Sequence, residues 1–479
     1  MMSHLAAGDG ADALSSDADA VIKANNADGG EGDQFEFEYE FIEEVEQLER
    51  YKSGGYHPVA VGDTLHHGRY RVINKLGHGT YSTSWMARDQ EANEYVALKI
   101  CTADSSGASN ERAVLRYLRQ QRVDCQDERV AMVSTLLDEF HLDGPNGWHA
   151  CIVTKPTRMS ISDTRETSSC YGLLHVPTAR AVIAQLIHAV AFCHEKGVVH
   201  GDLHLSNIMF HFPPSANIND LSQEAFYERF GQPMALPVKR LDGAPLGPGV
   251  PEKVMPGAWL GCASEKVALA DCAISVADFG EAYMVTPPGS TLSSRGQQQQ
   301  QEPPECHTPQ RLRPPEARFA PSELSPASDV WTLACAVFEI AGANPLFFGS
   351  FFPTEDSVTE DWVDALGRLP DEWWARWGAW AESFTEDGER LDHSDDDVRG
   401  SIEHRFERRS QELRRKEGME EWAAEETAAL LGMLKAMLKY KPAERISAAE
   451  VLETEWMVKW GTPALEEMKM AQEKALNSK

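Results

Sequence analysis

Positive charge is scarce in this sequence. The 479 residues carry 45 Lys and Arg against 75 Asp and Glu, which gives a formal net charge of −30 at pH 7. A surface this acidic repels nucleic acid and anionic lipid and attracts basic peptides. We therefore expect no direct nucleic-acid partner and no membrane partner, and the charge favours a basic protein as substrate.

Paired cysteines, a secretory leader and long apolar runs are also missing. The nine cysteines are scattered without C-x-x-C spacing, which predicts reduced thiols and no zinc site. No charged segment followed by an apolar core opens the chain, so no secretory signal is expected. The most apolar segment, residues 330–348, is interrupted by Glu339 and Asn344 and predicts a buried helix. A cytoplasmic or nuclear location, or both, is therefore expected.

Polar segments divide the chain. The first fifty residues carry 14 acidic and 2 basic side chains, and we expect residues 1–45 to be disordered, although the alternation at 35–41 is equally typical of a strand. Insertions are predicted at about 211–256, rich in Pro and Gly, and at about 286–312, where a glutamine run favours a mobile loop. The acidic cluster at 392–397 is typical of a solvated loop.

Two short motifs carry the chemistry. The first reads H-G-D-L-H-L-S-N and places Asp202 five residues before Asn207, and the second is the D-F-G that begins at Asp278. Phosphoryl transfer from ATP needs such a set: one carboxylate orients the attacking hydroxyl, while a carboxamide and a second carboxylate hold Mg²⁺ on the phosphates. We predict Asp202 as the catalytic group and Asn207 and Asp278 as metal ligands.

Upstream segments supply the expected nucleotide contacts. Residues 76–82 read L-G-H-G-T-Y-S between two strand-like runs, and their glycines let backbone amides approach phosphate oxygens. V-A-L-K follows as a buried-strand pattern ending in Lys99, the cation expected at the α- and β-phosphates. Glu111 lies in the helical pattern of residues 110–118 and is the candidate partner of Lys99.

These motifs, with the stretch from Gly54 to Trp85, resemble the eukaryotic serine/threonine protein kinases, and in particular the SR-protein kinases in their divergent fungal form. The likeness implies an α+β, bilobal protein-kinase fold. A small β-rich N-lobe with the hinge would span residues 46–157, a large, mainly helical C-lobe 158–460, and a C-terminal tail 461–479. It also implies ATP and Mg²⁺ as cofactors, basic arginine/serine-rich proteins of the splicing type as substrates, and a monomer.

The resemblance assigns roles within the nucleotide site. The backbone of Gly77 to Ser82 would cover the triphosphate, and Thr154 would be the gatekeeper at the start of the hinge. The predicted ATP-binding residues are Leu76, Gly77, His78, Gly79, Thr80, Tyr81, Ser82, Ser84, Ala97, Lys99, Thr154, Lys155 and Thr157. The predicted catalytic residues are Asp202, Lys99, Glu111 and His204.

Two departures from the family pattern bear on regulation and catalysis. Gly201 replaces the arginine that in the family reads a phosphate on the activation segment, so we expect activity without such phosphorylation. His204 replaces a lysine, and a histidine neutralises the transferred phosphoryl group less well at neutral pH. Turnover is therefore expected to improve on mild acidification.

The C-terminal half holds further matches to the kinase pattern. R-P-P-E ending at Glu316 resembles the close of the activation segment, Asp329 lies at the start of the large central helix, and Arg445 lies in the last family block. The family implies a buried Glu316–Arg445 ion pair and an Asp329 carboxylate bound to backbone amides of the catalytic loop. By contrast, His188 and His194 are expected to be ordinary helix residues, and the tryptophans at 373–380 are expected to pack in a core.

Two alternatives stay open. H-G-D-L-H-x-x-N also occurs in small-molecule phosphotransferases such as the aminoglycoside and choline kinases, which lack the matches at Glu316, Asp329 and Arg445. The other alternative is a pseudokinase scaffold that binds ATP weakly without turnover. Ser84, where an apolar residue usually packs on adenine, and His204 keep this second alternative open.

Overall fold

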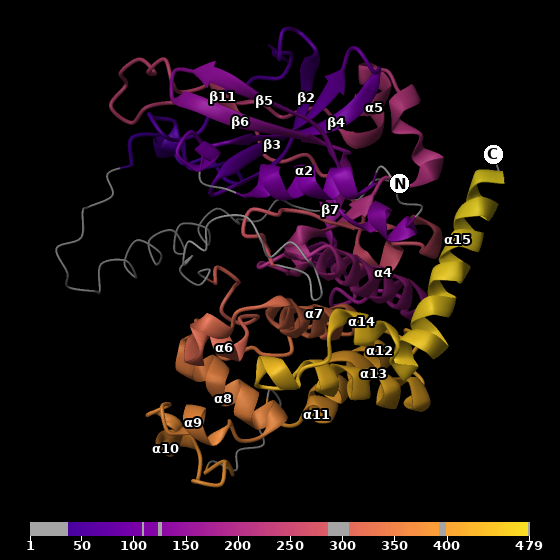
Figure 1. Ribbon diagram of the computed structural model, residues 1–479. Coiled ribbons are helices and arrows are strands. Elements are labelled where there is room, and N and C mark those ends of the chain that lie inside the picture. The colour runs from indigo at the N-terminus through magenta and orange to yellow at the C-terminus, as the bar shows by residue number, and fades with distance from the viewer. Residues whose placement is uncertain (1–36, 108–109, 123–126, 286–305, 392–398, 478–479) are drawn as a thin grey trace, which may run out of the picture.

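The structure is a computed structural model that describes residues 37–107, 110–122, 127–285, 306–391 and 399–477. A β-rich lobe is built mainly from the N-terminal part of the chain, and a larger helical lobe is built mainly from the C-terminal part (Figure 1). The predicted α+β, two-lobed architecture is confirmed.

The N-lobe is a six-stranded antiparallel sheet in the order β1-β2-β3-β4-β6-β5. The strands are β1 (Thr64–Leu65), β2 (Tyr70–Gly79), β3 (Ser82–Asp89), β4 (Glu94–Cys101), β5 (Leu136–Gly144) and β6 (Gly147–Thr154). Side chains alternate across the sheet, and one face buries Tyr70, Trp85 and Leu98 in a common core. Helix α2 (Glu111–Arg122) lies between this sheet and the C-lobe (Figure 1).

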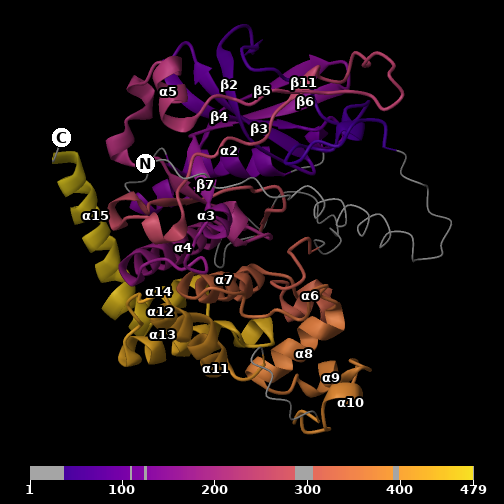
Figure 2. The same cartoon turned by 180° about the vertical axis from the view of Figure 1, so that it is seen from behind.

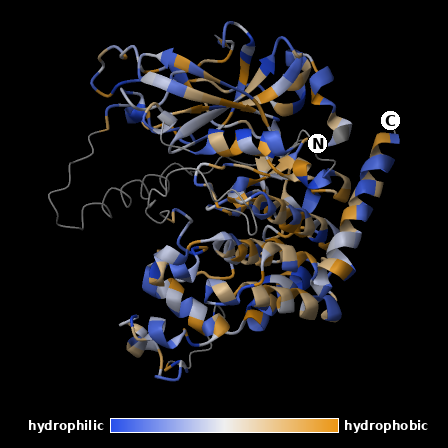
Figure 3. Cartoon of the chain, in the orientation of Figure 1, coloured by the Kyte–Doolittle hydropathy of each residue, from blue (hydrophilic) through white to orange (hydrophobic). Residues whose placement is uncertain are grey.

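Two buried helices, α4 (Val176–Glu195) and α7 (Pro326–Ala341), form the centre of the C-lobe. Hydrophobic residues gather along both of them in Figure 3. By length and composition α4 could cross a membrane, but 83% of its apolar window is buried inside the protein. The burial expected for residues 330–348 is present, yet α7 ends at Ala341 because Gly342 and then Pro345 interrupt it.

Shorter helices surround this pair. They are α3 (Ile161–Glu166), α6 (Pro315–Phe319), α8 (Glu355–Leu366), α9 (Asp371–Trp374), α10 (Trp380–Ser383), α11 (Ile402–Phe406), α12 (Glu412–Lys416), α13 (Ala424–Met437), α14 (Ala448–Leu452) and α15 (Thr462–Asn477). Trp373, Trp374 and Trp377 are buried among them, so the expectation of core packing holds for these rings. The segment expected as a tail forms α15, which packs beside α4 through Leu465 and Met468 (Figure 2).

Small sheets place the two motif loops side by side. β7 (Thr157–Ser160), β9 (Ile208–His211) and β12 (Ile274–Val276) form one sheet, and β8 (Val198–Val199) pairs with β13 (Tyr283–Met284). The H-G-D segment begins directly after β8, and the D-F-G segment begins one residue after the end of β12. The amide of Ala277 donates to the carbonyl of Asn207 at 2.8 Å, so the loops are joined by their backbones.

The insertion predicted at about 211–256 is folded onto the N-lobe. Its helix α5 (Gln223–Phe230) packs through Phe226 on Tyr95 of β4, with ring centroids 5.0 Å apart. Further along, β10 (Leu236–Pro237) and β11 (Lys253–Val254) form an antiparallel pair. The Pro- and Gly-rich composition therefore marks irregular backbone here, which is nonetheless packed.

The insertion also orders part of the N-terminal segment. Tyr39 is buried in a cluster with Val238 and Val254, and it makes a single β-bridge with Arg240. Residues 37–45 are therefore folded, because their aromatic side chain finds apolar partners in the insertion, and the expectation of disorder is wrong for them. The expectations for residues 1–36, the glutamine run and residues 392–397 fall outside the described residues.

Candidate active site

A cavity of about 700 Å³ lies between the lobes. Its lining includes most of the predicted nucleotide and metal residues: Leu76, Gly77, His78, Gly79, Ser82, Ser84, Ala97, Lys99, Glu111, Thr154, Thr157, Asn207 and Asp278. Thr80, Tyr81 and Lys155 lie outside this lining, since the first two form the turn between β2 and β3 and Lys155 follows the end of β6. The cavity joins the glycine-rich strand to both motif loops.

Lys99 connects the two lobes across this cavity. Its Nζ lies 2.7 Å from Glu111 Oε2, at the start of α2, and 2.8 Å from Asp278 Oδ1. Burial disfavours the ammonium ion, but the two carboxylates outweigh burial and raise the pKa of Lys99. Burial raises the pKa of Glu111, whereas for Asp278 the nearby Lys99 outweighs burial and lowers the pKa. Lys99 and Asp278 therefore face each other in their charged forms.

The loop after β8 holds Asp202, His204 and Asn207 together. Asn207 Nδ2 donates to the Asp202 carbonyl at 2.9 Å, and His204 Nε2 lies 3.4 Å from Asp202 Oδ2 and 3.1 Å from Asn207 Nδ2. Asp202 Oδ1 is buried and has no hydrogen-bond partner among the described residues. Asp202 lies outside the cavity lining, and its unpaired Oδ1 is the candidate acceptor for a substrate hydroxyl.

Asp329, in the first turn of α7, binds the backbone of the same loop. Its carboxylate accepts hydrogen bonds from the amides of His200 at 2.7 Å and Gly201 at 2.9 Å. His194 Nε2 also lies 2.9 Å from this carboxylate, so the expectation that His194 is an ordinary helix residue is wrong. Burial opposes the charge on Asp329, but the His194 contact and the backbone amides prevail and lower its pKa. His194 escapes sequence reasoning because it reaches Asp329 only through the packing of α4 on α7.

The donor atoms on the cavity floor suit Mg²⁺. Asn207 donates through its amide nitrogen, which leaves its side-chain oxygen as the atom for a cation, and Asp278 adds a carboxylate. A hard cation takes carboxylate and carboxamide oxygens, so the residues fit the ion that the motifs predict. Asn207 and Asp278 would hold it, and the bound ion would neutralise negative charge on the phosphates.

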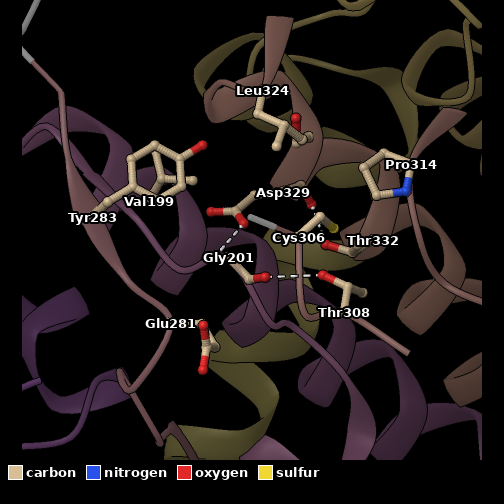
Figure 4. Close-up of a pocket in the computed structure, with 11 residues that line it drawn as sticks. Val199, Gly201, Glu281, Tyr283, Cys306, Thr308, Pro314, Leu324, Asp329 and Thr332 are labelled. Carbon is tan, nitrogen blue, oxygen red and sulfur yellow. Dashed lines mark hydrogen bonds between the residues drawn. The ribbon is translucent and has the colours of Figure 1, made fainter. Parts of the chain in front are cut away.

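The activation segment contacts the catalytic loop directly. Thr308 Oγ1 donates to the carbonyl of Gly201 at 2.9 Å, as Figure 4 shows. Gly201 has φ 78°, and a Cβ at this position would lie 2.6 Å from the carbonyl oxygen of Glu281. An arginine therefore does not fit this backbone, and a threonine hydroxyl makes the contact between the segment and the loop.

Glu316 and Arg445 form the buried ion pair that the family pattern implies. The Arg445 guanidinium binds the carboxylate twice, with Nη1 2.7 Å from Oε1 and Nη2 2.6 Å from Oε2. Both side chains are fully buried, and Ser328 Oγ donates a further hydrogen bond to Glu316 at 2.7 Å. The pair fixes the end of the activation segment to the C-lobe core.

The fold and this site define a protein kinase, and residues 70–228 match the protein kinase domain. Among known proteins, SRSF protein kinase 3 of Homo sapiens is 34% identical over 35% of this chain. Protein kinase dsk1 of Schizosaccharomyces pombe is 35% identical over 34% of this chain and 30% of its own length. Over about a third of its length, the chain is therefore similar to SR-protein kinases.

The extent of these similarities differs between relatives. The chain spans 30% of the length of SRSF protein kinase 3. Serine/threonine-protein kinase SRPK of Physarum polycephalum is 26% identical over 87% of this chain and 92% of its own length. The similarity to the Physarum kinase therefore extends over both lobes. The sequence identity to the Homo sapiens and Schizosaccharomyces pombe kinases is higher but covers a shorter part of the chain.

Proposed function

We propose that this protein is an ATP- and Mg²⁺-dependent protein kinase that phosphorylates serine or threonine in basic, arginine/serine-rich proteins. One observation carries the catalytic part: Lys99 contacts Glu111 and Asp278 at once, while Asp202 and Asn207 lie on the adjoining loop. Protein kinases need both the lysine–glutamate pair and the aspartate of D-F-G in place. The complete set argues against a pseudokinase scaffold.

In this proposal each side chain has one task. Lys99, held by Glu111, aligns the phosphates, while Asn207 and Asp278 hold the metal ion. Asp202 Oδ1, which has no other described hydrogen-bond partner, orients the substrate hydroxyl and accepts its proton. Loss of this acid–base contact is expected to lower the rate by about 10²–10⁴-fold.

The substrate class rests on charge and on the family. The names of the SRSF protein kinases refer to SRSF proteins as their substrates, and the net charge of −30 on this chain attracts basic partners. Catalysis by a monomer in the cytoplasm or nucleus, without contact to nucleic acid or membrane, completes the proposal. The Glu316–Arg445 pair disfavours the small-molecule phosphotransferases, which lack it.

Activity without phosphorylation of the activation segment is a further part of the proposal. The Thr308–Gly201 hydrogen bond supports it, because this contact joins the segment to the catalytic loop with no phosphate. A phosphatase-treated sample is expected to keep its full activity. Loss of activity after this treatment would contradict this part of the proposal and leave the catalytic part intact.

The decisive experiment measures transfer from labelled ATP with Mg²⁺ to three acceptors: an arginine-serine repeat peptide, a generic basic protein and a small aminocyclitol. Transfer to the repeat peptide, lost in Asp202→Asn, is the expected result. Transfer only to the aminocyclitol would indicate a small-molecule phosphotransferase. A folded protein that binds ATP and transfers nothing would indicate a scaffold.

A further inference from the structure

Residues 257–262, which we call the mouth strap, border the opening of the nucleotide cavity. They follow β11 at the end of the insertion, outside the kinase motifs recognised in the sequence. Gly257, Ala258 and Trp259 nevertheless line the cavity together with Leu76 and Thr157, where the adenine is expected. The segment directly after the insertion thus contributes a wall to a site that the motifs alone do not complete.

The mouth strap is bound to the N-lobe wall of the cavity. The Ala258 amide donates to the Lys75 carbonyl at 2.8 Å, which extends the edge of the glycine-rich strand β2. Gly257 approaches the same strand so closely that a Cβ there would lie 2.9 Å from the Leu76 carbonyl oxygen. Leu76, Ala258 and Leu260 pack on one hydrophobic cluster. The start of the mouth strap is therefore fixed relative to the adenine side of β2.

The other end is bound to β7, just after the hinge. Arg158 Nε donates to the Leu260 carbonyl at 3.1 Å, and Arg158 Nη2 lies 3.5 Å from Cys262 Sγ. A Cβ on Gly261 would overlap the side chain of Met159. Because Arg158 and Met159 also line the cavity, the mouth strap joins its upper and lower walls on the hinge side.

Trp259 is the residue of the mouth strap that is suited to touch a ligand. Trp259 lines the cavity and yet is 46% exposed, so this large residue lies at the opening with part of it facing solvent. An indole face stacks on any base or covers a ribose, and such contacts are lost on substitution by alanine. The phosphate-binding groups Lys99 and Asp278 belong to other walls of the cavity.

We propose that Trp259 contacts the adenosine part of the bound nucleotide and that the mouth strap slows nucleotide release. The inference rests on the proposed function, since it requires that the cavity binds ATP. It adds a nucleotide-binding residue from the mouth strap to those of the kinase motifs. Stacking of this kind, with the ring still partly exposed, is expected to change affinity by about tenfold.

The test compares the full chain with Trp259→Ala, Trp259→Phe and Trp148→Ala. Calorimetry gives the Kd for ATP, ADP and adenosine, and stopped-flow fluorescence gives the release rate of a fluorescent ADP. Trp259→Ala is expected to bind all three ligands about tenfold more weakly and to release the ADP analogue faster, whereas Trp259→Phe restores most of the affinity. Trp148 is 42% exposed and stacks on His141 away from the cavity, so its alanine variant should bind as the wild type does.

A second variant tests the mouth strap without removing the ring. Gly257→Val places a branched side chain against the Leu76 carbonyl, which is expected to displace the segment and to speed ADP release. If wild-type protein binds no nucleotide, the proposed function itself fails. If wild-type protein binds and Trp259→Ala binds adenosine equally well, or loses affinity for ATP alone, the inference about Trp259 is wrong while the proposed function stands.

Discussion

Substitution of Gly201 by alanine tests how the catalytic loop is held. The backbone of Gly201 has φ 78°, in the left-handed region, where a residue with a Cβ costs roughly 1–2 kcal/mol. The added Cβ would also lie 2.6 Å from the carbonyl oxygen of Glu281. Because the obstacle is backbone, relieving the overlap adds about 1–3 kcal/mol. The free energy of unfolding should therefore fall by about 2–5 kcal/mol in total.

The same substitution should lower turnover. Gly201 donates to Asp329 Oδ1 at 2.9 Å and accepts from Thr308 Oγ1 at 2.9 Å, so a shift of this residue moves the neighbouring Asp202. A displacement of about 1 Å can lower a rate by about 10²-fold. Urea denaturation measures the stability change, and peptide phosphorylation under saturating ATP measures the rate.

Gly243 provides a matched control. Its φ is 72°, close to that of Gly201, but a Cβ there would meet nothing within 4 Å. Gly243→Ala should lose about 1–2 kcal/mol from backbone strain and keep the wild-type rate. Gly201→Arg, which restores the usual kinase residue, carries the same Cβ and should reduce activity. Wild-type stability and a raised rate in Gly201→Arg would refute the reasoning.

Three further predictions concern charge. Glu316→Gln leaves the fully buried Arg445 without its carboxylate and should destabilise the protein by about 3–5 kcal/mol, as measured by thermal denaturation. A loss below about 1 kcal/mol would show that the ion pair is dispensable. His204→Lys places a fixed positive charge beside Asp202, so its rate of peptide phosphorylation at neutral pH should exceed that of the wild type. An unchanged or lower rate would count against this role. Burial and the neighbouring His149 lower the pKa of His57 to about 4. Below the usual histidine pKa the unfolded chain therefore binds more protons than the folded protein does. About 3 kcal/mol of the free energy of unfolding should be lost between pH 7 and pH 4. His57→Gln should lose less in a denaturant series over this range, and equal losses would contradict the assignment.

The catalytic residues were predictable because short-range patterns place them. Asp202 and Asn207 lie within one loop, and the loop itself brings the amide of Asn207 to the Asp202 carbonyl at 2.9 Å. Lys99 lies on a strand whose alternation turns its side chain toward the cavity, and Glu111 lies 12 residues later at the first turn of the next helix. The kinase pattern names Lys99 and Glu111 as partners, and the packing of α2 beside the sheet brings the Lys99 ammonium to the Glu111 carboxylate.

The insertion was not predictable, because its partners lie far away in the sequence and follow no period. A Pro- and Gly-rich segment reads as a loop, yet its backbone groups bind distant residues. Asn146 Nδ2 donates to the carbonyl of Gly249 at 2.7 Å, and the Ala258 amide donates to Lys75 at 2.8 Å. In both contacts residues 249 and 258 contribute backbone atoms, which every residue has, so the composition of this part of the chain carries no signal for them.

Contacts between unmodified residues fix both the N-lobe side and the C-lobe side of the nucleotide site. On the N-lobe side, the buried Lys75–Glu46 ion pair lies behind the glycine-rich strand, and Tyr56 donates to the Gly79 carbonyl at 2.8 Å. On the C-lobe side, Asp329 and Thr308 fix the catalytic loop. A phosphate on an activation segment stabilises a kinase by supplying charge for contacts that are otherwise missing. Here a neutral hydroxyl makes the contact between the segment and the loop, and this is the physical reason for expecting activity in the unphosphorylated chain.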